Sequence, residues 1–393
     1  MVDTQDLMAG LNPQQQKAVI HEGAPLLVVA GAGSGKTRVL TRRIAYLMAR
    51  RGVAPYEILA ITFTNKAAGE MKARVGELVG PVAQSMWVST FHSACVRILR
   101  KEASLLGYTN SFTIYDQSDS LRLITLVMRD LNLDAKRYAP RAVAALISQA
   151  KNELMGPADY LNQGKDQFQE IVAQVFAIYQ KRLSGANSMD FDDLILKTVE
   201  VLQRYPEAKA RFRSRFRHVL VDEYQDTNHA QYILVKELVG SELEGQAPAE
   251  LCVVGDADQS IYGFRGATIR NILQFELDYP NARTVLLEQN YRSTQNILNA
   301  ANAVITKNES RKEKNLWSDA GAGSPLTGYV AESEHDEANF IADEIRSLQR
   351  EGVSTPGDTA IFYRTNAQSR VFEEVFMRNA LPYKVVGGLR FYE

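Results

Sequence analysis

The chain has 393 residues, of which 45% are hydrophobic and 23% are charged. This size and composition predict a soluble protein of two or three domains rather than a disordered chain. The 45 lysines and arginines are balanced by 46 acidic residues, which excludes a general basic surface, so any nucleic acid must bind in a local groove. No apolar run approaches the roughly 18 residues of a membrane span, and two cysteines are too few for a disulfide framework. We therefore expect a cytoplasmic protein without a membrane partner.

Short apolar runs alternate with helical patterns over the first hundred residues. This order is typical of βαβ units that build a parallel sheet. The runs expected to form strands are Leu26–Ala30, Ile58–Phe63 and Trp87–Thr90, and those expected to form helices are Lys36–Ala49, Asn65–Leu78 and His92–Leu106. The sequence therefore predicts an α/β fold.

The alternation stops between about Ser118 and Phe216, where the periodicity is helical. We expect an all-helical insert there, formed by Leu121–Asp130, Ala142–Glu153, Phe168–Leu183 and Phe191–Leu202. Strand patterns return at His218–Asp222, Leu251–Gly255 and Thr284–Leu287. After Glu288 a second α/β unit is expected, with helices at Thr294–Ile305, His335–Arg350 and Gln368–Asn379 and strands at Gly328–Val330, Thr359–Tyr363 and Tyr383–Val386.

The first expected strand leads into a glycine-rich loop, Ala30–Thr37, that ends in Gly35-Lys36-Thr37. Small residues let the backbone surround a phosphate, and the N–H groups of the loop and the following helix supply positive partial charge. Lys36 is placed to reach the β- and γ-phosphates, and the hydroxyl of Thr37 is placed to ligate Mg²⁺. The first glycine of the usual pattern is replaced by Ala30, and a tight turn that merely packs the helix is the alternative.

An acidic pair follows the expected strand that begins at His218. Asp222 would hold Mg²⁺ through water, and Glu223 would polarise the water that attacks the phosphate. On its own, such a pair is more typical of a solvated loop. Together with the glycine-rich loop, it predicts an ATP or GTP site.

Further motifs follow the other expected strands. They occupy Thr62–Ala68, Ser89–His92, Asp222–Asn228, Val254–Tyr262 and Leu287–Ser293. In this order and spacing, the set closely resembles the superfamily 1A DNA helicases of the UvrD/PcrA/Rep type (DNA helicase II). The resemblance runs from Leu11 to the last residue.

The resemblance implies ATP and Mg²⁺ as cofactors and gives roles to particular residues. Gln15 matches the glutamine that reads the adenine edge, and Tyr291 matches the ring that packs against adenine. The implied catalytic residues are Lys36, Glu223, Gln259 and Arg292, of which Gln259 senses the γ-phosphate and Arg292 contacts it. The implied nucleotide-binding residues are Gln15, Ala30, Gly31, Ala32, Gly33, Ser34, Gly35, Lys36, Thr37, Arg38, Tyr291 and Arg292, with Thr37 and Asp222 on the metal. The implied contacts with single-stranded DNA are Phe63, Thr90, His92, Tyr262, Phe264, Arg265 and Asn366.

Aromatic residues among these contacts suit a protein that binds any DNA sequence. Every base has a π-face, and stacking on an aromatic side chain contributes about 1–3 kcal/mol per base. Tyr262 and Phe264 flank Gly263 in a loop, which favours a DNA-binding role. Phe63 ends an apolar run, so a place in the core is an equal alternative.

The resemblance also implies two RecA-like motor domains, each interrupted by an insert. It divides the chain into motor domain 1A at 1–115 and 216–285, the helical insert 1B at 116–215, and the first half of motor domain 2A at 286–393. Insert 2B and the rest of 2A would be absent, together with an arginine finger that contributes about 10³–10⁵ in rate in related chemistry. We therefore expect the 393-residue chain to bind Mg-ATP weakly and to hydrolyse it slowly.

The implied activity is ATP-dependent 3′→5′ movement on single-stranded DNA that unwinds duplex junctions, in repair or replication and with protein partners of those pathways. The alternatives are a catalytically impaired module that binds ATP and DNA, the motor part of a helicase–nuclease, a nucleotide switch, and a small-molecule kinase. A switch or kinase has no reason to carry Gln259 or a second α/β unit. Dependence of ATP hydrolysis on DNA separates these classes.

Overall fold

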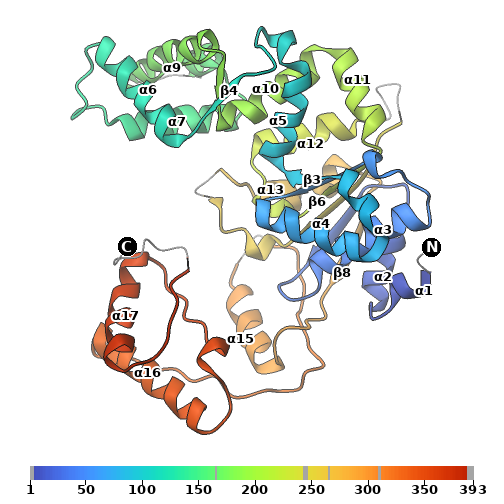
Figure 1. Ribbon diagram of the computed structural model, residues 1–393, viewed down its shortest axis with the longest axis vertical. Helices are drawn as coiled ribbons and strands as arrows, with labels where there is room; N and C mark the ends of the chain where they lie inside the picture. Colours follow the sequence, from blue (N-terminus) through green and yellow to red (C-terminus); the bar gives the residue numbers. More distant parts are fainter. Residues whose placement is uncertain (1–3, 164–165, 242–246, 264–265, 309–310, 387–393) are drawn as a thin grey trace. The chain divides into compact units, whose positions relative to one another are not determined.

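The computed structural model describes residues 4–163, 166–241, 247–263, 266–308 and 311–386 (Figure 1). The chain divides into two compact units, Met1–Gly323 and Ser324–Glu393. Within the described ranges, no helix combines the length and the apolar character that crossing a membrane requires.

The first unit is built around a parallel sheet, which has six strands within the part of the chain that the structure describes (Figure 1). The strands are β1 Leu26–Ala30, β2 Ile58–Thr62, β3 Trp87–Thr90, β6 His218–Val221, β7 Glu250–Gly255 and β8 Arg283–Leu287. Their spatial order is β3-β2-β6-β7-β1-β8, and neighbouring strands run parallel. The carboxyl ends of these strands therefore meet at one edge of the sheet. The predicted α/β fold is confirmed.

The two faces of the sheet have separate cores, because successive side chains of a strand point in opposite directions. On one face, Leu27 and Val29 of β1 pack with helices α5, α10 and α12. On the other face, Leu26 and Val28 pack with α2, α3 and α4. These helices are α2 Pro13–Ile20, α3 Lys36–Ala49, α4 Asn65–Val79, α5 Phe91–Glu102, α10 Phe191–Arg204 and α12 His229–Val239. Burial on both faces explains why the strands are continuous apolar runs in the sequence.

Helices dominate the stretch between Tyr115 and His218, as its periodicity predicts. Besides α10 they are α6 Gln117–Asp130, α7 Pro140–Asn152, α8 Pro157–Gln163, α9 Gln167–Gly185 and α11 Pro206–Arg215. Helices α6, α7 and α9 share a core of their own around Phe176 and Tyr179. Two short strands that we did not expect, β4 Thr113–Tyr115 and β5 Ser188–Asp190, pair in parallel, so the insert is not entirely helical. Three residues are too few for an alternating pattern to reveal a strand.

The first unit also contains short or peripheral helices, namely α1 Thr4–Met8, α13 Arg270–Leu273, α14 Phe275–Asp278 and α15 Gln295–Ile305. The second unit contains α16 Glu334–Arg350 and α17 Ser369–Arg378, which share a small core around Ala342 and Phe376. The prediction of strands in this unit is wrong, because its described residues contain no strand. The predicted strands were Gly328–Val330, Thr359–Tyr363 and Tyr383–Val386. A strand needs a paired backbone beside it, and Phe362 is 94% exposed.

Candidate functional site

The glycine-rich loop lies at the carboxyl edge of the sheet, between the end of β1 at Ala30 and the start of α3 at Lys36. Gly33 and Gly35 have φ angles of 69° and 88°, in the left-handed region that favours glycine. The N–H and the hydroxyl of Ser34 both donate to the carbonyl oxygen of Gly31, at 3.3 and 2.7 Å. The loop thus turns directly into the N-terminus of α3, where unpaired backbone N–H groups favour a phosphate.

Three of the predicted catalytic side chains meet beside this loop. Nζ of Lys36 lies 2.7 Å from Oε2 of Glu223 and 3.4 Å from Oε1 of Gln259. The lysine side chain is 11% exposed, so its ammonium group is largely removed from water. Its charge is balanced by the carboxylate of Glu223, which lies at the end of a different strand.

The backbone of Glu223 has φ 48° and ψ 46°, the left-handed conformation. For a residue with a Cβ this conformation costs roughly 1–2 kcal/mol. The preceding residue, Asp222, lies just past β6 but keeps a hydrogen bond to β2, since its N–H donates to the carbonyl of Ile61 at 2.9 Å. The side chain of Glu223 is also held by Nε2 of Gln225, which donates to Oε2 at 2.9 Å. Backbone strain where β6 ends, at a side chain that pairs with Lys36, is characteristic of functional sites.

The environment of Asp222 suits a cation. The residue is 7% exposed, and burial together with the nearby charge of Glu223 raises the pKa of its carboxyl to about 6. Oxygen ligands of this kind fit Mg²⁺, which protein sites usually hold through one or two carboxylates, with waters and substrate phosphates completing the shell. Within the described residues, no group of three or more His, Cys, Asp or Glu is arranged to hold a metal ion. Asp222 and the half-buried Thr37 stay the predicted ligands.

The segment that follows β8 closes over the loop. Nδ2 of Asn290 donates to the carbonyl oxygen of Ala32 at 2.6 Å, and the N–H of Tyr291 donates to the carbonyl of Gly33 at 2.9 Å. Oδ1 of Asn290 accepts from the N–H of Arg292 at 2.8 Å. The fold therefore brings Arg292 to the phosphate loop. Asn290 lies within the motif Leu287–Ser293 but has no role among the predicted site residues, although its place beside Tyr291 and Arg292 is a usable signal.

Gln15 joins helix α2 to the same loop. Its Nε2 donates to the carbonyl of Ser34 at 2.9 Å, its Oε1 accepts from the N–H of Asn12 at 3.0 Å, and the residue is fully buried. Nδ2 of Asn12 in turn donates to the hydroxyl of Tyr291 at 3.0 Å. The structure thus places Gln15 and Tyr291 around the loop, and their contacts with adenine stay predictions. Arg38 is exposed, and its Nη2 donates to the carbonyl oxygen of Ala9 at 3.4 Å. Its contact with the nucleotide also stays a prediction.

Three of the predicted DNA contacts lie at the ends of β2 and β3. Phe63 is half-buried and meets the ring of Phe91 edge-on, with centroids 5.8 Å apart. Thr90 caps α5 through its hydroxyl, which accepts from the N–H of Ser93. His92 meets the ring of Phe191 at 5.6 Å, and burial lowers the pKa of its imidazole. These residues share one edge of the sheet, although Phe63 and Thr90 also have structural partners.

The other predicted DNA contacts are more scattered. Tyr262 is half-buried, and its carbonyl accepts from the N–H of Ala267 at 3.3 Å. Phe264 and Arg265 lie outside the described residues. Asn366 is exposed and begins a 3₁₀ turn in the second unit. Their contacts with DNA stay predictions.

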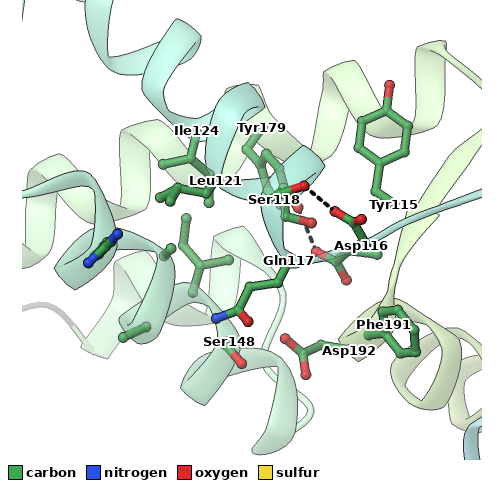
Figure 2. A pocket seen from close by; sticks show the side chains of 16 residues that line it. Tyr115, Asp116, Gln117, Ser118, Leu121, Ile124, Ser148, Tyr179, Phe191 and Asp192 are labelled. Atoms are coloured by element: carbon green, nitrogen blue, oxygen red, sulfur yellow. Dashed lines mark hydrogen bonds between the residues drawn. The ribbon is translucent and has the colours of Figure 1, made fainter. Parts of the chain in front are cut away.

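A cleft of about 1080 Å³ opens among the helices that follow β4 (Figure 2). Figure 2 shows Asp192 near Ser148 on one wall, and Asp116 bonded to the hydroxyl of Ser118 on another. Burial, followed by the charge of Asp190, raises the pKa of Asp192 to about 6. The cleft therefore holds a carboxyl whose pKa lies above the usual range of an aspartate.

Next to Asp192 in sequence, two carboxylates hold a buried lysine. Nζ of Lys151 lies 2.6 Å from Oδ2 of Asp190 and 2.9 Å from Oδ1 of Asp193, and the side chains of Lys151 and Asp193 are fully buried. The hydroxyl of Tyr179 donates to the same Oδ2 of Asp190 at 2.7 Å. Sequence reasoning missed this cluster, because a lysine within a helical pattern is usually a solvated residue.

Two models of known protein families match this chain. Residues 11–280 match the family model of the UvrD/REP helicase N-terminal domain, and residues 285–393 match that of the UvrD-like helicase C-terminal domain. The chain belongs to the UvrD/REP helicase family. The resemblance found in the sequence motifs is thereby confirmed, and a RecA-like architecture fits the parallel sheet.

Curated relatives of this UvrD/REP helicase chain include two ATP-dependent DNA helicases. UvrD1 of Mycobacterium tuberculosis (strain ATCC 25618 / H37Rv) is 63% identical over 392 residues, which cover 98% of this chain and 51% of the relative. PcrA of Bacillus subtilis (strain 168) is 51% identical over 387 residues, which cover 98% of this chain and 52% of the relative. The chain therefore spans about half the length of the curated relatives that it matches.

Proposed function

We propose that this chain carries the ATP-hydrolysing centre of a DNA helicase that moves 3′→5′ along single-stranded DNA and unwinds duplex junctions in DNA repair or replication. The observation that carries the proposal is the meeting of Lys36, Glu223 and Gln259 beside the glycine-rich loop. The family and the names of its relatives, ATP-dependent DNA helicases, support ATP and DNA as the substrates.

The charges of the site suggest the order of events. While Lys36 is paired with Glu223, this carboxylate is a poor acceptor for a proton of water. A bound triphosphate carries more negative charge than one carboxylate and so attracts the ammonium group. Glu223 then becomes available to orient and polarise the attacking water. Mg²⁺, held by Asp222 and Thr37, would supply neutralisation of the charge that develops on the phosphate oxygens.

Two further residues would stabilise the transition state. The amide of Gln259 lies within hydrogen-bonding range of Lys36 in this structure. When the ammonium of Lys36 moves to the γ-phosphate, this amide can move with it. Asn290 holds the backbone of Arg292 at the phosphate loop, so that the exposed guanidinium can reach the same oxygens. Preorganised hydrogen-bond donors and positive charges of this kind are often the largest single contribution to phosphoryl transfer.

The test is ATP hydrolysis by the protein with and without single-stranded DNA. DNA is expected to accelerate turnover, and Lys36→Ala is expected to abolish it, whereas Lys17→Ala, at an exposed lysine of α2, should leave it unchanged. An ATP turnover rate that does not change when DNA is added would instead favour a nucleotide switch or a kinase. DNA binding and function that survive Lys36→Ala would favour a noncatalytic module. Polarity is read from strand displacement on duplexes with a 3′ or a 5′ single-stranded tail, and preference for the 5′ tail would overturn 3′→5′ movement.

A further inference from the structure

A buried ion cluster lies next to the catalytic side chains but is not part of them. Nζ of Lys314 contacts Oδ1 of Asp256 at 2.5 Å and also bonds to Oδ2 of Asp258. Nη2 of Arg311 bonds to the same atom of Asp258 at 3.0 Å. The side chains of Lys314 and Asp256 are each 3% exposed, so both charges are almost completely removed from water.

One member of this cluster also holds a proposed catalytic residue. Oδ2 of Asp256 accepts from Nε2 of Gln259 at 2.6 Å, while its Oδ1 faces Lys314. Because Nε2 points to Asp256, Oε1 of Gln259 points to Nζ of Lys36 at 3.4 Å. The orientation of the Asp256 carboxylate therefore sets the orientation of the Gln259 amide.

The segment that carries Lys314 also touches the phosphate loop. A Cβ built on Gly31 would collide with the side chain of Leu316. The N–H of Trp317 donates to the carbonyl of Glu288 at 3.1 Å, and its carbonyl accepts from the N–H of Asn290 at 2.7 Å. The 311–317 segment thus contacts the loop after β7, the glycine-rich loop and the segment that bears Arg292.

We propose that Lys314 is a positioning residue for ATP hydrolysis, an inference that rests on the proposed function. Lys314 fixes the carboxylate of Asp256, which in turn aims Gln259 at Lys36 and the γ-phosphate. Without this cation, Oδ1 of Asp256 would keep the N–H of Asp258, at 3.0 Å, but would lose the charge that fixes the buried carboxylate. A carboxylate that turns in this way disturbs the bond to Gln259. Lys314 itself does not touch the nucleotide.

The test compares Lys314→Met with Lys312→Met. Lys312 lies in the same segment and forms an ion pair with Glu276 at 2.8 Å, which does not lead to Gln259. Small displacements of catalytic groups can reduce rates on the order of 10²-fold, so kcat is expected to fall between about 10-fold and 100-fold in Lys314→Met. KM for ATP should change by less than about threefold, because Lys314 makes no contact that would hold ATP before the reaction. Lys312→Met should keep the parent kcat.

A double-mutant cycle with Gln259→Ala separates positioning from a purely structural role. If Lys314 acts through Gln259, Lys314→Met should have little further effect on kcat once Gln259 is replaced. The proposal would be overturned if the fold-loss of kcat in the double variant equals the product of the two single losses. It would also be overturned if Lys314→Met keeps the kcat of the parent protein. Lys314→Gln keeps a donor for Asp256 and serves in the same cycle if Lys314→Met does not fold. Unfolding of both variants would assign Lys314 a stabilising role alone and would also overturn the proposal.

The same experiments distinguish this inference from the function on which it rests. Absence of ATP hydrolysis in the parent protein would overturn the proposed function together with the inference. A parent protein that hydrolyses ATP, combined with independent effects of Lys314 and Gln259, would overturn the inference alone.

Discussion

Nζ of Lys36 and Oε2 of Glu223 are 187 residues apart in the chain and form an ion pair of 2.7 Å. The pair joins the residue proposed to hold the phosphates to the residue proposed to polarise water. Each charge neutralises the other while the pair persists. We therefore expect nucleotide binding to separate the two side chains before hydrolysis begins.

Glu223→Gln is expected to separate nucleotide binding from hydrolysis. Loss of the general base should lower turnover by about 10²–10⁴-fold. ATP binding should be kept or become tighter, because Lys36 no longer has to leave a carboxylate. Single-turnover hydrolysis and the binding of a fluorescent ATP analogue measure the two effects, with Glu70→Gln on the exposed face of α4 as the control. Markedly weaker nucleotide binding would contradict the role assigned to the ion pair.

Gly33→Ala is expected to damage the phosphate loop specifically. An added Cβ would lie 2.7 Å from Nδ2 of Asn290 and 2.8 Å from Cβ of Arg292. Gly23→Ala is a matched control, because Gly23 also has a positive φ but has no atom within 4 Å of the added Cβ. Both variants should lose about 1 kcal/mol of stability from backbone strain. Gly33→Ala alone should also weaken ATP binding, at least tenfold by titration, and equal binding by the two variants would refute this.

Lys151→Met is expected to be strongly destabilising. The substitution removes the cation between two buried carboxylates, those of Asp190 and Asp193, and breaking a buried ion pair in this way costs about 3–5 kcal/mol. Arg182→Met removes a cation from Asp130, but this pair is 39% and 48% exposed and should contribute less than about 1 kcal/mol. Urea denaturation measures both variants. Similar losses for the two would show that the buried cluster contributes little to stability.

The stability of the protein should depend on the protonation of Asp192. This carboxyl titrates near 3.9 in an unfolded chain, whereas burial raises its pKa to about 6 in the folded protein. The folded protein therefore binds the proton more tightly, and this contribution favours folding at low pH and is lost as the pH rises through about 6. Asp192→Asn carries no charge, so it should be more stable than the parent at pH 8 by about 1–3 kcal/mol.

The advantage of Asp192→Asn should shrink as the pH falls from 6 toward 4, because the parent carboxyl then becomes neutral as well. Unfolding free energies at pH 8, 6 and 4 check this. The control is Glu153→Gln, which removes an exposed carboxyl at the end of α7. An Asp192→Asn protein that is no more stable than the parent at pH 8 would show that the cleft solvates the charge.

The parts of this protein that could be predicted from the sequence have local signals. Strand β1 and helix α3 were predicted with their observed bounds, because an apolar run, a glycine-rich turn and a helical period follow one another directly. The acidic pair Asp222 and Glu223 could be placed beside the glycine-rich loop for a similar reason, since both residues follow a strand and the carboxyl ends of parallel strands meet at one edge. These features depend on residues that are close together in the chain or on a general rule of sheet topology.

The parts that could not be predicted depend on distant contacts. The environment of Lys314 is set by Asp256 and Asp258, more than fifty residues earlier, and nothing in the local pattern marks this lysine as buried. The apolar run Thr359–Tyr363 has the composition of a strand but has no paired backbone in the described residues. The local preference for a strand is not enough in such cases, because a strand forms only where a neighbouring strand can pair with it.

The bond from Asn290 to Ala32 closes a loop of 258 residues. Closing so long a loop costs chain entropy before the contact adds stability. During synthesis, which proceeds from the N-terminus, the glycine-rich loop emerges from the ribosome long before the residues that cover it. The residues of the glycine-rich loop are therefore synthesised early, but the segments that pack on the loop are all present only after residue 317 has been made.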